Sequence, residues 1–493
     1  MSAIHQAIHH LNRNIRDGHS SPTIPFSDFL KIMTKDPLPS IRSVFQLFHN
    51  MVKSKVEGGY DEYQGDPESI QFYYWNFDKL FVDDSDNPFF ADRLFANRFM
   101  RLVDTMQRGA RQNKIYVFEG PHGSGKSTFL FNLLNKFEEY TNSAEGMRYE
   151  TVWRLDRHQL DSLMSHETLA SVERLLDLLD SPDADKIDLL KAHNALHTGE
   201  DFLEIPCPSH DHPLLQIPKE LRRDFLDELF SNDEVKWKLF TEKEYEWLFS
   251  ANACTICNSI YQALLSRLQQ PQKVLEMLHV RPYQFKRRIG EGISVFSPGD
   301  EPLKNSTLTN EVLQQRINSL FRDSNQVRYI FSSYAKTNNG IYALMDIKGH
   351  NRDRLFQLHN ILSDGVHKVE DIEESVHSLF LALINPEDKE AIEKFQSLSD
   401  RVEMISIPYI LDLNTEVQIY RNVFGRHIDA HFLPKVLHNF ARVIISSRLN
   451  LNSPAMLEWI HDPAKYRSYC DSQLQLLKME IYTGYIPDRK SVV

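Results

Sequence analysis

Short apolar runs separated by helical or loop segments dominate the hydrophobic pattern of this chain. The first run, at 114–118, precedes a glycine-rich turn and then apolar residues at helical spacing. Short runs that are apolar on both faces are typical of parallel strands covered by helices. The pattern therefore predicts an α/β fold built on a parallel sheet, with later strands at 149–156, 327–334, 340–346, 377–385 and 402–409.

Most of the remaining chain has helical periodicity. Residues 90–106 are predicted to form an amphipathic helix that leads into the first strand. The mostly helical stretch 157–327 is longer than one crossover connection needs, so we interpret it as an insertion. We expect a helical N-terminal region at 1–105, an α/β domain at 106–410 that contains this insertion, and a wholly helical part with a tail at 411–493.

The segment 70–81 contains six aromatic residues among its twelve positions. Such a segment can dock a partner, but aromatic side chains are more often buried. We interpret it as part of the core of the helical N-terminal region.

The formal net charge of −12 argues against binding of a nucleic-acid backbone as the main task. The first ten residues carry no apolar core of a signal peptide, and no apolar run is long enough to span a bilayer. The sequence contains only four cysteines, which argues against a fold held by disulfides and fits a reducing compartment. We therefore expect a cytoplasmic protein without membrane contact.

The glycine-rich turn fits the phosphate-loop pattern G-x-x-x-x-G-K-[ST]. Its backbone N–H groups and the start of the following helix would bind the phosphates of ATP, Lys126 would reach the β- and γ-phosphates, and Ser127 would bind Mg²⁺. A chance match is disfavoured because a strand precedes the turn and a helix follows it. The predicted nucleotide-binding residues are Gly120, Pro121, His122, Gly123, Ser124, Gly125, Lys126, Ser127 and Thr128.

Three cysteines and a histidine in the predicted insertion have the composition of a structural zinc site. Cys207 and His210 form a C-x₂-H pair, and Cys254 and Cys257 form a C-x₂-C pair before a helix. A Cys₃His set binds Zn²⁺ tetrahedrally, and His212 is an alternative to His210. Ordinary buried thiols or a redox-active C-x-x-C remain alternatives, although no thioredoxin-like βαβ pattern surrounds the pair.

Several segments resemble the AAA domain of the PrkA-type serine protein kinases, and the resemblance covers roughly 90–449. The family implies an AAA+ module: an αβα nucleotide-binding domain followed by a small helical lid, usually assembled as a ring. The segments that carry the resemblance are 120–127, 211–213, 297–301, 338–341, 400–402, 407–409, 416–420 and 447–449.

The resemblance also implies roles for single residues. Asn385, at the end of its strand, resembles the sensor-1 residue that orients the attacking water, and Arg401 resembles the arginine finger that reaches a neighbouring subunit. Arg442 and Arg448 both resemble the sensor-2 arginine of the lid. Simpler roles stay open, because Asn385 could cap a strand end and Arg401 could pair with Asp400.

The sequence departs from the family at the acidic strand, where Asp346 is the only carboxylate beside Met345 and Ile347. One carboxylate would then serve both Mg²⁺ binding and water activation, so hydrolysis could be slow. The sequence also contains neither an H-R-D catalytic loop nor a D-F-G motif of protein kinases. We expect no kinase region of that type.

These observations favour an oligomeric, Mg²⁺-dependent AAA+ ATPase that acts on a protein partner. A serine protein kinase, as the family name implies, is the first alternative. A binding scaffold that ATP holds together with little turnover is the second, and the single carboxylate at Asp346 favours it.

Overall fold

The computed structural model describes most of the chain between residues 23 and 448. The described residues are 23–61, 73–107, 114–156, 160, 202–297, 299–300, 307–321, 326–347, 352–389, 400–410, 412–425 and 435–448.

A five-stranded parallel sheet forms the centre of the fold, which confirms the predicted α/β class. Nearly all residues of its three inner strands are buried, as expected for a sheet covered on both faces. The strand order is β15 (Val402–Ser406), β4 (Ile115–Glu119), β14 (Leu379–Ile384), β11 (Ile341–Leu344) and β8 (Ile293–Phe296).

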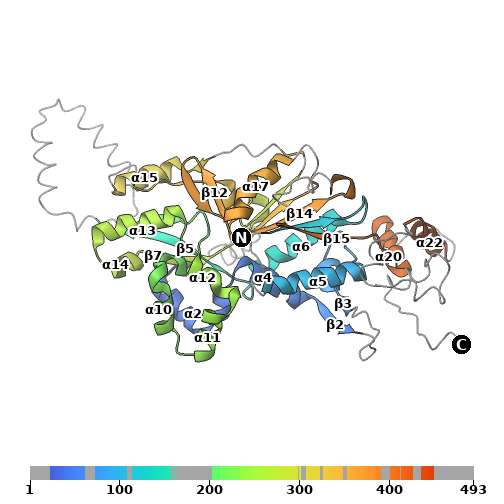
Figure 1. Ribbon diagram of the computed structural model, residues 1–493, viewed down its shortest axis with the longest axis horizontal. Coiled ribbons are helices and arrows are strands. Elements are labelled where there is room, and N and C mark those ends of the chain that lie inside the picture. The colour runs from blue at the N-terminus through green and yellow to red at the C-terminus, as the bar shows by residue number, and fades with distance from the viewer. Residues whose placement is uncertain are drawn as a thin grey trace, which may run out of the picture.

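Helices cover both faces of this sheet (Figure 1). Alternate residues of each strand point to opposite faces, so Tyr116 and Phe118 pack on one side and Ile115 and Val117 on the other. The first face packs on α4 (Val44–Lys55), α5 (Arg93–Gln107) and α6 (Lys126–Thr141). The second face packs on α17 (Arg352–Asp364). The result is a three-layer αβα domain.

The first face carries a continuous cluster of phenylalanines around α5 and α6. The ring of Phe129 lies 4.7 Å from Phe118 and 5.1 Å from Phe95, centroid to centroid. Phe89 and Phe81 extend the cluster, at 5.3 and 5.4 Å from Phe129. Burial of one such side chain stabilises a fold by about 1.5–3 kcal/mol. This cluster therefore fixes the segment before α5 against the helix that follows the glycine-rich loop.

The aromatic segment 70–81 contributes to this core, but not as a helical region. Its described part forms β3 (Tyr73–Asn76), which pairs with β2 (Glu57–Asp61), and a π-helical turn, η1 (Asp78–Val82). Phe77, Leu80 and Phe81 of the segment are buried. Tyr73 and Tyr74 are 37% and 40% exposed. Because consecutive residues of a strand point to opposite faces, both faces of the hairpin are partly exposed at this end of β3.

A second sheet of four antiparallel strands lies beside the central domain, in the order β1 (Ile24–Pro25), β7 (Leu278–Pro282), β5 (Tyr149–Asp156) and β6 (Phe202–Pro206). The predicted strand at 149–156 is therefore real, but it does not belong to the parallel sheet. A short apolar run does not reveal which strands it pairs with.

The described part of the predicted insertion is mostly helical. Its helices pack with the second sheet and with α2 (Phe26–Lys35) and α3 (Pro37–Ser40) around a separate apolar core. They are α10 (Lys219–Leu229), α11 (Asp233–Thr241), α12 (Glu246–Ser250), α13 (Thr255–Leu268), α14 (Pro271–Glu276) and α15 (Glu311–Phe321), with single turns at η2 (Pro213–Gln216), η3 (Lys243–Tyr245) and η4 (Arg287–Ile289).

Two short segments differ from the expected arrangement of the parallel sheet. Strand β8 falls inside the range predicted as insertion, yet it pairs with β11 in the central sheet. The run at 327–334 contributes only β10 (Ile330–Phe331), which pairs with β9 (Leu308–Thr309) outside that sheet, and α16 (Ser333–Lys336). The antiparallel pair β12 (Val366–Val369) and β13 (Ile372–Ser375) follows α17. The limits of the three predicted units stay predictions.

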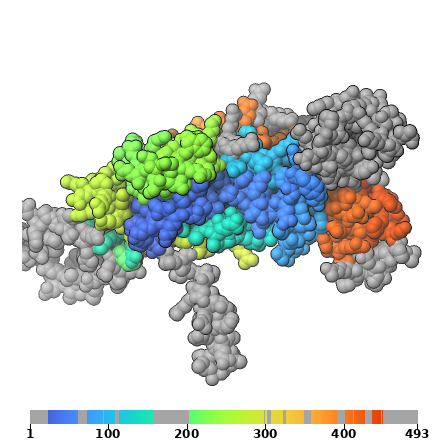
Figure 2. All heavy atoms as spheres, turned by 90° about the horizontal axis from the view of Figure 1, so that it is seen from below, coloured from blue at the N-terminus to red at the C-terminus, as the bar shows by residue number. Residues whose placement is uncertain are grey.

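Two helices form the described part of the C-terminal helical unit. α20 (Leu413–Phe424) and α22 (Val436–Arg448) pack together through Val417, Leu437 and Ala441. Figure 2 shows this orange pair at one end of the molecule, against the blue N-terminal segments. Among the helices that the structure describes, none is both long and apolar enough to cross a membrane.

Candidate functional site

The glycine-rich loop connects the end of β4 to the start of α6, as its sequence predicts. Gly125 adopts φ +84° directly before α6, a left-handed conformation that side chains rarely adopt. A Cβ on Gly120 would lie 2.5 Å from the carbonyl oxygen of Ile407, so a larger residue does not fit there. The two glycines thus permit a tight turn that brings the loop amides to the N-terminus of α6, where anions bind well.

Lys126 is almost fully buried at the base of this loop. Its ammonium group donates hydrogen bonds to the carbonyl oxygens of Gly120, at 2.6 Å, and Pro121, at 2.9 Å. Burial lowers the pKa of Lys126, and the charge of Asp346 opposes that shift. The ammonium group thus lies inside the loop, close enough to Asp346 for the charge of that carboxylate to act on it.

Asp346 and Asn385 lie at the same edge of the sheet as the loop. Asn385 directly follows β14, the neighbour of β4, and it is 4% exposed. Asp346 follows β11 by two residues in a left-handed conformation, φ +45°. The N–H of Ile347 donates to Leu383 of β14 at 2.9 Å, which holds this segment against its neighbour. The carboxylate, the amide and the lysine thus surround the carboxyl end of β14.

Met345 and Ile347 do not add polar groups to this edge. Met345 belongs to the apolar cluster on the α6 face and Ile347 to the cluster on the α17 face. The carboxylate of Asp346 therefore stands alone on its strand, as the sequence indicates. Glu119 supplies a further carboxylate at the end of β4, where it pairs with Lys389 at 3.1 Å. Sequence reasoning missed Glu119, although it directly precedes the glycine motif.

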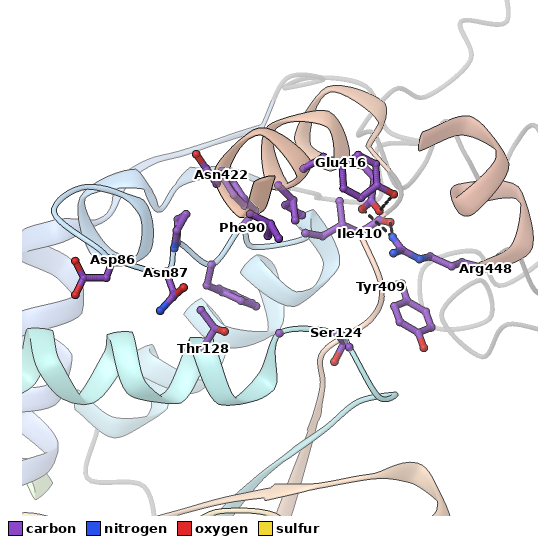
Figure 3. Close-up of a pocket in the computed structure, with 17 residues that line it drawn as sticks. Asp86, Asn87, Phe90, Ser124, Thr128, Tyr409, Ile410, Glu416, Asn422 and Arg448 are labelled. Carbon is purple, nitrogen blue, oxygen red and sulfur yellow. Dashed lines mark hydrogen bonds and ion pairs between the residues drawn. The ribbon is translucent and has the colours of Figure 1, made fainter. Parts of the chain in front are cut away.

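A pocket of about 290 Å³ lies between the glycine-rich loop, the segment before α5 and the lid helices (Figure 3). The three parts of its wall come from distant segments of the chain, and both polar and aromatic side chains line it. The lining residues are Asp86, Asn87, Pro88, Phe89, Phe90, Gly123, Ser124, Gly125, Thr128, Tyr409, Ile410, Glu416, Ile419, Tyr420, Asn422, Val423 and Arg448.

The two candidate sensor-2 arginines differ in position. Arg448 lines the pocket, where it donates to Glu416 at 2.8 Å and to the carbonyl oxygen of Ile410 at 3.1 Å (Figure 3). Its guanidinium lies 5.0 Å from the ring centroid of Tyr409, whose hydroxyl donates to the loop residue His122 at 2.9 Å. Arg442 is exposed and contacts Asn439. Among the contacts of the described residues, Arg448 is connected to the glycine-rich loop through Tyr409.

Arg401 directly precedes β15 and lies at the amino ends of the strands, opposite to the glycine-rich loop. Its carbonyl oxygen accepts a hydrogen bond of 2.9 Å from the N–H of Ile115, the first residue of β4. The five residues of β4 separate this point from the loop by about 16 Å. No ion pair joins Arg401 to Asp400, both of which the structure describes, and Nη1 of Arg401 is buried without a hydrogen-bond partner among the described residues.

A second cluster of polar side chains lies in the insertion. Cys207 follows β6, Cys254 caps the N-terminus of α13, and Cys257 lies in the first turn of that helix. All three are buried and free, with 3.6 Å between the Sγ atoms of Cys207 and Cys254. The structure thus brings together the three cysteines that the sequence predicts as ligands. Their fourth neighbour is Asp211, and the four ligand atoms lie within 4.8 Å of one another.

His210, predicted as the fourth ligand, points away from the thiols. Its Nδ1 lies 2.5 Å from Glu150 and its Nε2 lies 3.2 Å from Glu291, while its ring stacks on Tyr283 at 4.0 Å. His210 itself has a left-handed backbone, φ +52°. The structure therefore places Asp211, and not the predicted His210, beside the three thiols.

His212, the alternative ligand, is also engaged elsewhere. Its Nε2 lies 2.9 Å from the carbonyl oxygen of Ser40, and its Nδ1 accepts a hydrogen bond from the N–H of Leu214. Burial lowers its pKa to about 3, and the charge of Arg148 adds to this shift. His212 is thus a neutral core histidine. The only sequence signal for Asp211 was a ligand-type side chain in the same short loop as Cys207.

A comparison with family models supports the expected nucleotide-binding architecture. The model of the PrkA AAA domain matches residues 202–455. This range includes strands β8, β11, β14 and β15, the lid helices and the cysteine cluster, and it begins after the glycine-rich loop. No curated protein matches the chain.

The matched range completes the central sheet around β4, and β4 carries the glycine-rich loop, so the two parts form one nucleotide-binding domain. Because the match spans more than half of the 493 residues, the chain belongs to the PrkA AAA domain family of AAA+ nucleotide-binding proteins.

Proposed function

We propose that this chain is a Mg²⁺-dependent ATPase that works as an oligomer on a protein partner. The observation that carries this proposal is that the polar groups are divided between the carboxyl ends and the amino ends of the strands of the sheet. Lys126, Asp346 and Asn385 share the edge with the glycine-rich loop, whereas Arg401 lies at the other edge. One chain therefore offers a nucleotide site at the carboxyl ends of the strands, and at their amino ends an arginine whose Nη1 has no hydrogen-bond partner among the described residues.

The nucleotide would bind with its phosphates in the glycine-rich loop. Lys126 would exchange its hydrogen bonds with Gly120 and Pro121 for bonds to the β- and γ-phosphates, which are stronger because both partners are charged. Ser127 and Asp346 would bind Mg²⁺ directly or through water. The pocket between Phe90, Tyr409 and the lid has room for the base and ribose. The loop thereby binds ATP through phosphate charge and the pocket through apolar contact.

Turnover would need a group that stabilises charge on the γ-phosphate. Asn385 would orient the attacking water, with Asp346 after the neighbouring strand β11 as the carboxylate that assists it. Arg401 lies beside the start of β4, at the end of that strand that is remote from the glycine-rich loop. We therefore infer that it would act on ATP bound to an adjacent subunit and not on ATP bound to its own chain. A guanidinium supplied in this way is worth a large factor in rate in other NTPases. Hydrolysis would then depend on assembly.

The lid would transmit the state of the nucleotide. Arg448 bonds to Glu416 on α20 and contacts Tyr409, which in turn bonds to the loop. A γ-phosphate would compete with Glu416 for Arg448, because both are anions. If Arg448 exchanged Glu416 for the γ-phosphate, α20 and α22 would change their angle to the central domain. The surface that they present to the next subunit or to the protein partner would change with it.

A scaffold with little turnover is the second candidate, and the single carboxylate at Asp346 favours it. In this case ATP would hold the assembly together, and hydrolysis would be slow at every protein concentration. A serine protein kinase is the third candidate from the family name, and it predicts phosphoserine in the chain or its partner.

One experiment separates the three candidates. The ATPase rate per chain is measured over a wide range of protein concentration, and phosphoserine is detected in the same reactions. A rate per chain that rises with protein concentration supports the oligomeric ATPase. A constant, slow rate with nucleotide-dependent assembly supports the scaffold, and Lys126-dependent phosphoserine supports the kinase.

A structural zinc ion is a further cofactor that we propose, on the chemistry of the cysteine cluster. Three thiols at the end of β6 and the start of α13 are the soft ligands that Zn²⁺ prefers in closed structural sites. Such an ion would join these two elements and stabilise the insertion without taking part in ATP turnover.

A further inference from the structure

The cysteine cluster has the dimensions of a tetrahedral site. With a Zn–S bond of about 2.3 Å, two ligands at the tetrahedral angle are separated by about 3.7 Å. The Sγ atoms of Cys207 and Cys254 are 3.6 Å apart, much longer than a disulfide of about 2.05 Å. All four ligand atoms lie within 4.8 Å of one another. One ion therefore fits between them without movement of the backbone.

The groups around the cluster are arranged for thiolates and a carboxylate. The N–H of Asp211 donates to Sγ of Cys207, and the N–H of Cys257 donates to Sγ of Cys254, both at 3.4 Å. The N–H of Cys254 donates to the carboxylate of Asp211 at 2.7 Å, which fixes its orientation beside the thiols. Backbone donors to sulfur and a fixed carboxylate are typical of the surroundings that orient metal ligands.

Two buried arginines beside the cluster lack a counter-ion among the described residues. Arg148 is 2% exposed, and its Nε and Nη2 atoms have no hydrogen-bond partner there. Arg222 is 1% exposed and donates only to carbonyl oxygens. The charge of Glu220 acts on Arg222 and that of Glu150 on Arg148, but Asp211 is the acidic residue that acts on both guanidinium groups. Buried charges without an ion pair are costly, so two beside one cluster need an explanation.

We propose that Cys207, Cys254, Cys257 and Asp211 bind one zinc ion as a site with two net negative charges, which Arg148 and Arg222 neutralise. Three thiolates and one carboxylate around a divalent ion leave those two negative charges, and binding releases the thiol protons to solvent. The two arginines then have the counter-charge that the neutral thiols cannot supply. Zn²⁺ favours this donor set over Mg²⁺ and Ca²⁺, which prefer oxygen ligands.

Arg222 also positions the two ligand loops relative to each other. Its guanidinium donates to Leu215 and Ile217 after Asp211, and to Leu248 and Ala251 before Cys254. These carbonyl groups hold the charge close to both loops. Replacement by lysine would keep a positive charge but could not bond to four carbonyl groups at once. Arg222 is therefore a positioning residue of the site, as well as part of its charge balance.

The test measures the metal content of the full-length chain, purified without chelator and without added metal. Inductively coupled plasma mass spectrometry should find about one zinc per chain. Cys257→Ser should lose the zinc, whereas Cys470→Ser, a substitution of the one cysteine that is not a proposed ligand, should retain it. Less than about a tenth of a zinc per wild-type chain, together with no uptake of Zn²⁺ against a chromophoric chelator, would overturn the proposal. Iron in place of zinc would also overturn it.

A second pair of variants tests which side chain is the fourth ligand. Asp211→Asn should lower the affinity for Zn²⁺ at least about tenfold, while His210→Asn should leave it unchanged. The opposite result would replace Asp211 by His210. Reconstitution of the wild-type chain with Co²⁺ gives a readout that does not depend on any variant. Intense visible bands with thiolate charge transfer are expected for a tetrahedral Cys₃Asp site, and weak octahedral bands would exclude it. None of these readouts uses ATP turnover.

Discussion

Single side chains decide what the nucleotide site can do. Lys126 is the clearest case, because its ammonium group already lies inside the glycine-rich loop and bonds to Gly120 and Pro121. Arg448 is a second case, because it alone of the two lid arginines reaches the pocket. Asp346 is a third case, because no second carboxylate accompanies it on its strand, and in the proposed reaction it would limit the rate of hydrolysis.

Lys126→Ala should abolish ATP binding, because it removes the positive charge that faces the β- and γ-phosphates. We expect the dissociation constant of a fluorescent ATP analogue to rise by at least about 100-fold, as for loss of a buried charged hydrogen bond. Lys219→Ala, on the exposed surface of α10, is the control. Normal affinity of Lys126→Ala for ATP would contradict the assignment of the phosphate loop.

Arg448→Ala should weaken the response of the lid to ATP, whereas Arg442→Ala should not. The expected loss is about tenfold in the preference for ATP over ADP, since Arg448 would contact the γ-phosphate and ADP lacks it. Isothermal titration with both nucleotides measures that preference. An equal effect of the two substitutions would show that the position of Arg448 in the pocket has no functional meaning.

At the scale of elements, the fold depends on how the insertion joins the start of β11. The side chains of Asn338 and Asn339 donate to the carbonyl oxygen of Ser209, at 2.9 and 3.3 Å, in the loop that carries Cys207 and Asp211. Asn338 also accepts a hydrogen bond of 2.7 Å from His377, just before β14. Hydrogen bonds thus connect the loop of the cysteine cluster to the starts of β11 and β14, the two strands that precede Asp346 and Asn385.

Asn338→Ala should destabilise the central domain, because it leaves buried donors and acceptors without partners. The expected loss is about 2 kcal/mol of the free energy of unfolding, measured by chemical denaturation. Asn258→Ala, at an exposed position of α13, should have little effect. A stability of Asn338→Ala equal to that of this control would mean that the contact contributes nothing.

Removal of zinc with a strong chelator should lower the unfolding temperature of the chain and leave the buried arginines without counter-charge. The expected shift is several degrees, because the site joins β6 to α13. Differential scanning calorimetry with and without chelator measures it, and the Cys257→Ser variant should not respond to the chelator. An equal response of the wild type and the variant would attribute the shift to another cause.

The elements also show how far the sequence leads. The inner strands β4, β11 and β14 were predicted because their residues are apolar on both faces, and the glycine-rich loop was predicted because its glycines occupy fixed positions. The sheet that receives 149–156 was not predicted, since periodicity indicates a strand but not its partners. Strand β8 was missed because four residues inside a long helical range give little signal.

The fourth residue of the cysteine cluster shows the same limit at finer scale. His210 and Asp211 are neighbours in the sequence, and histidine is the more frequent partner of cysteine at zinc. In the structure the ring of His210 contacts Glu150 and Glu291 instead, and Asp211 lies beside the thiols. The spacing of the residues in the sequence does not show which of two neighbours in a loop faces the cysteines.

At the scale of the whole molecule, the two edges of the central sheet divide the proposed reaction between subunits. The loop, Asp346 and Asn385 bind and position ATP at one edge, and Arg401 lies about 16 Å away along β4 at the other. A single chain would then be a slow enzyme, and an assembled ring a faster one. The lid, through Arg448 and Glu416, would connect this cycle to the protein partner.

A mixing experiment with two inactive variants tests most directly whether Arg401 acts on ATP bound to a neighbouring subunit. Lys126→Ala retains Arg401 but does not bind ATP, and Arg401→Ala binds ATP but lacks the arginine. Each variant alone should hydrolyse ATP far more slowly than the wild type, and Arg316→Ala, an exposed arginine on α15, should not. A mixture of the two variants should recover activity, because Arg401 of one variant can act on ATP bound to the other. A mixture no more active than its separate components, or full activity of Arg401→Ala alone, would contradict it.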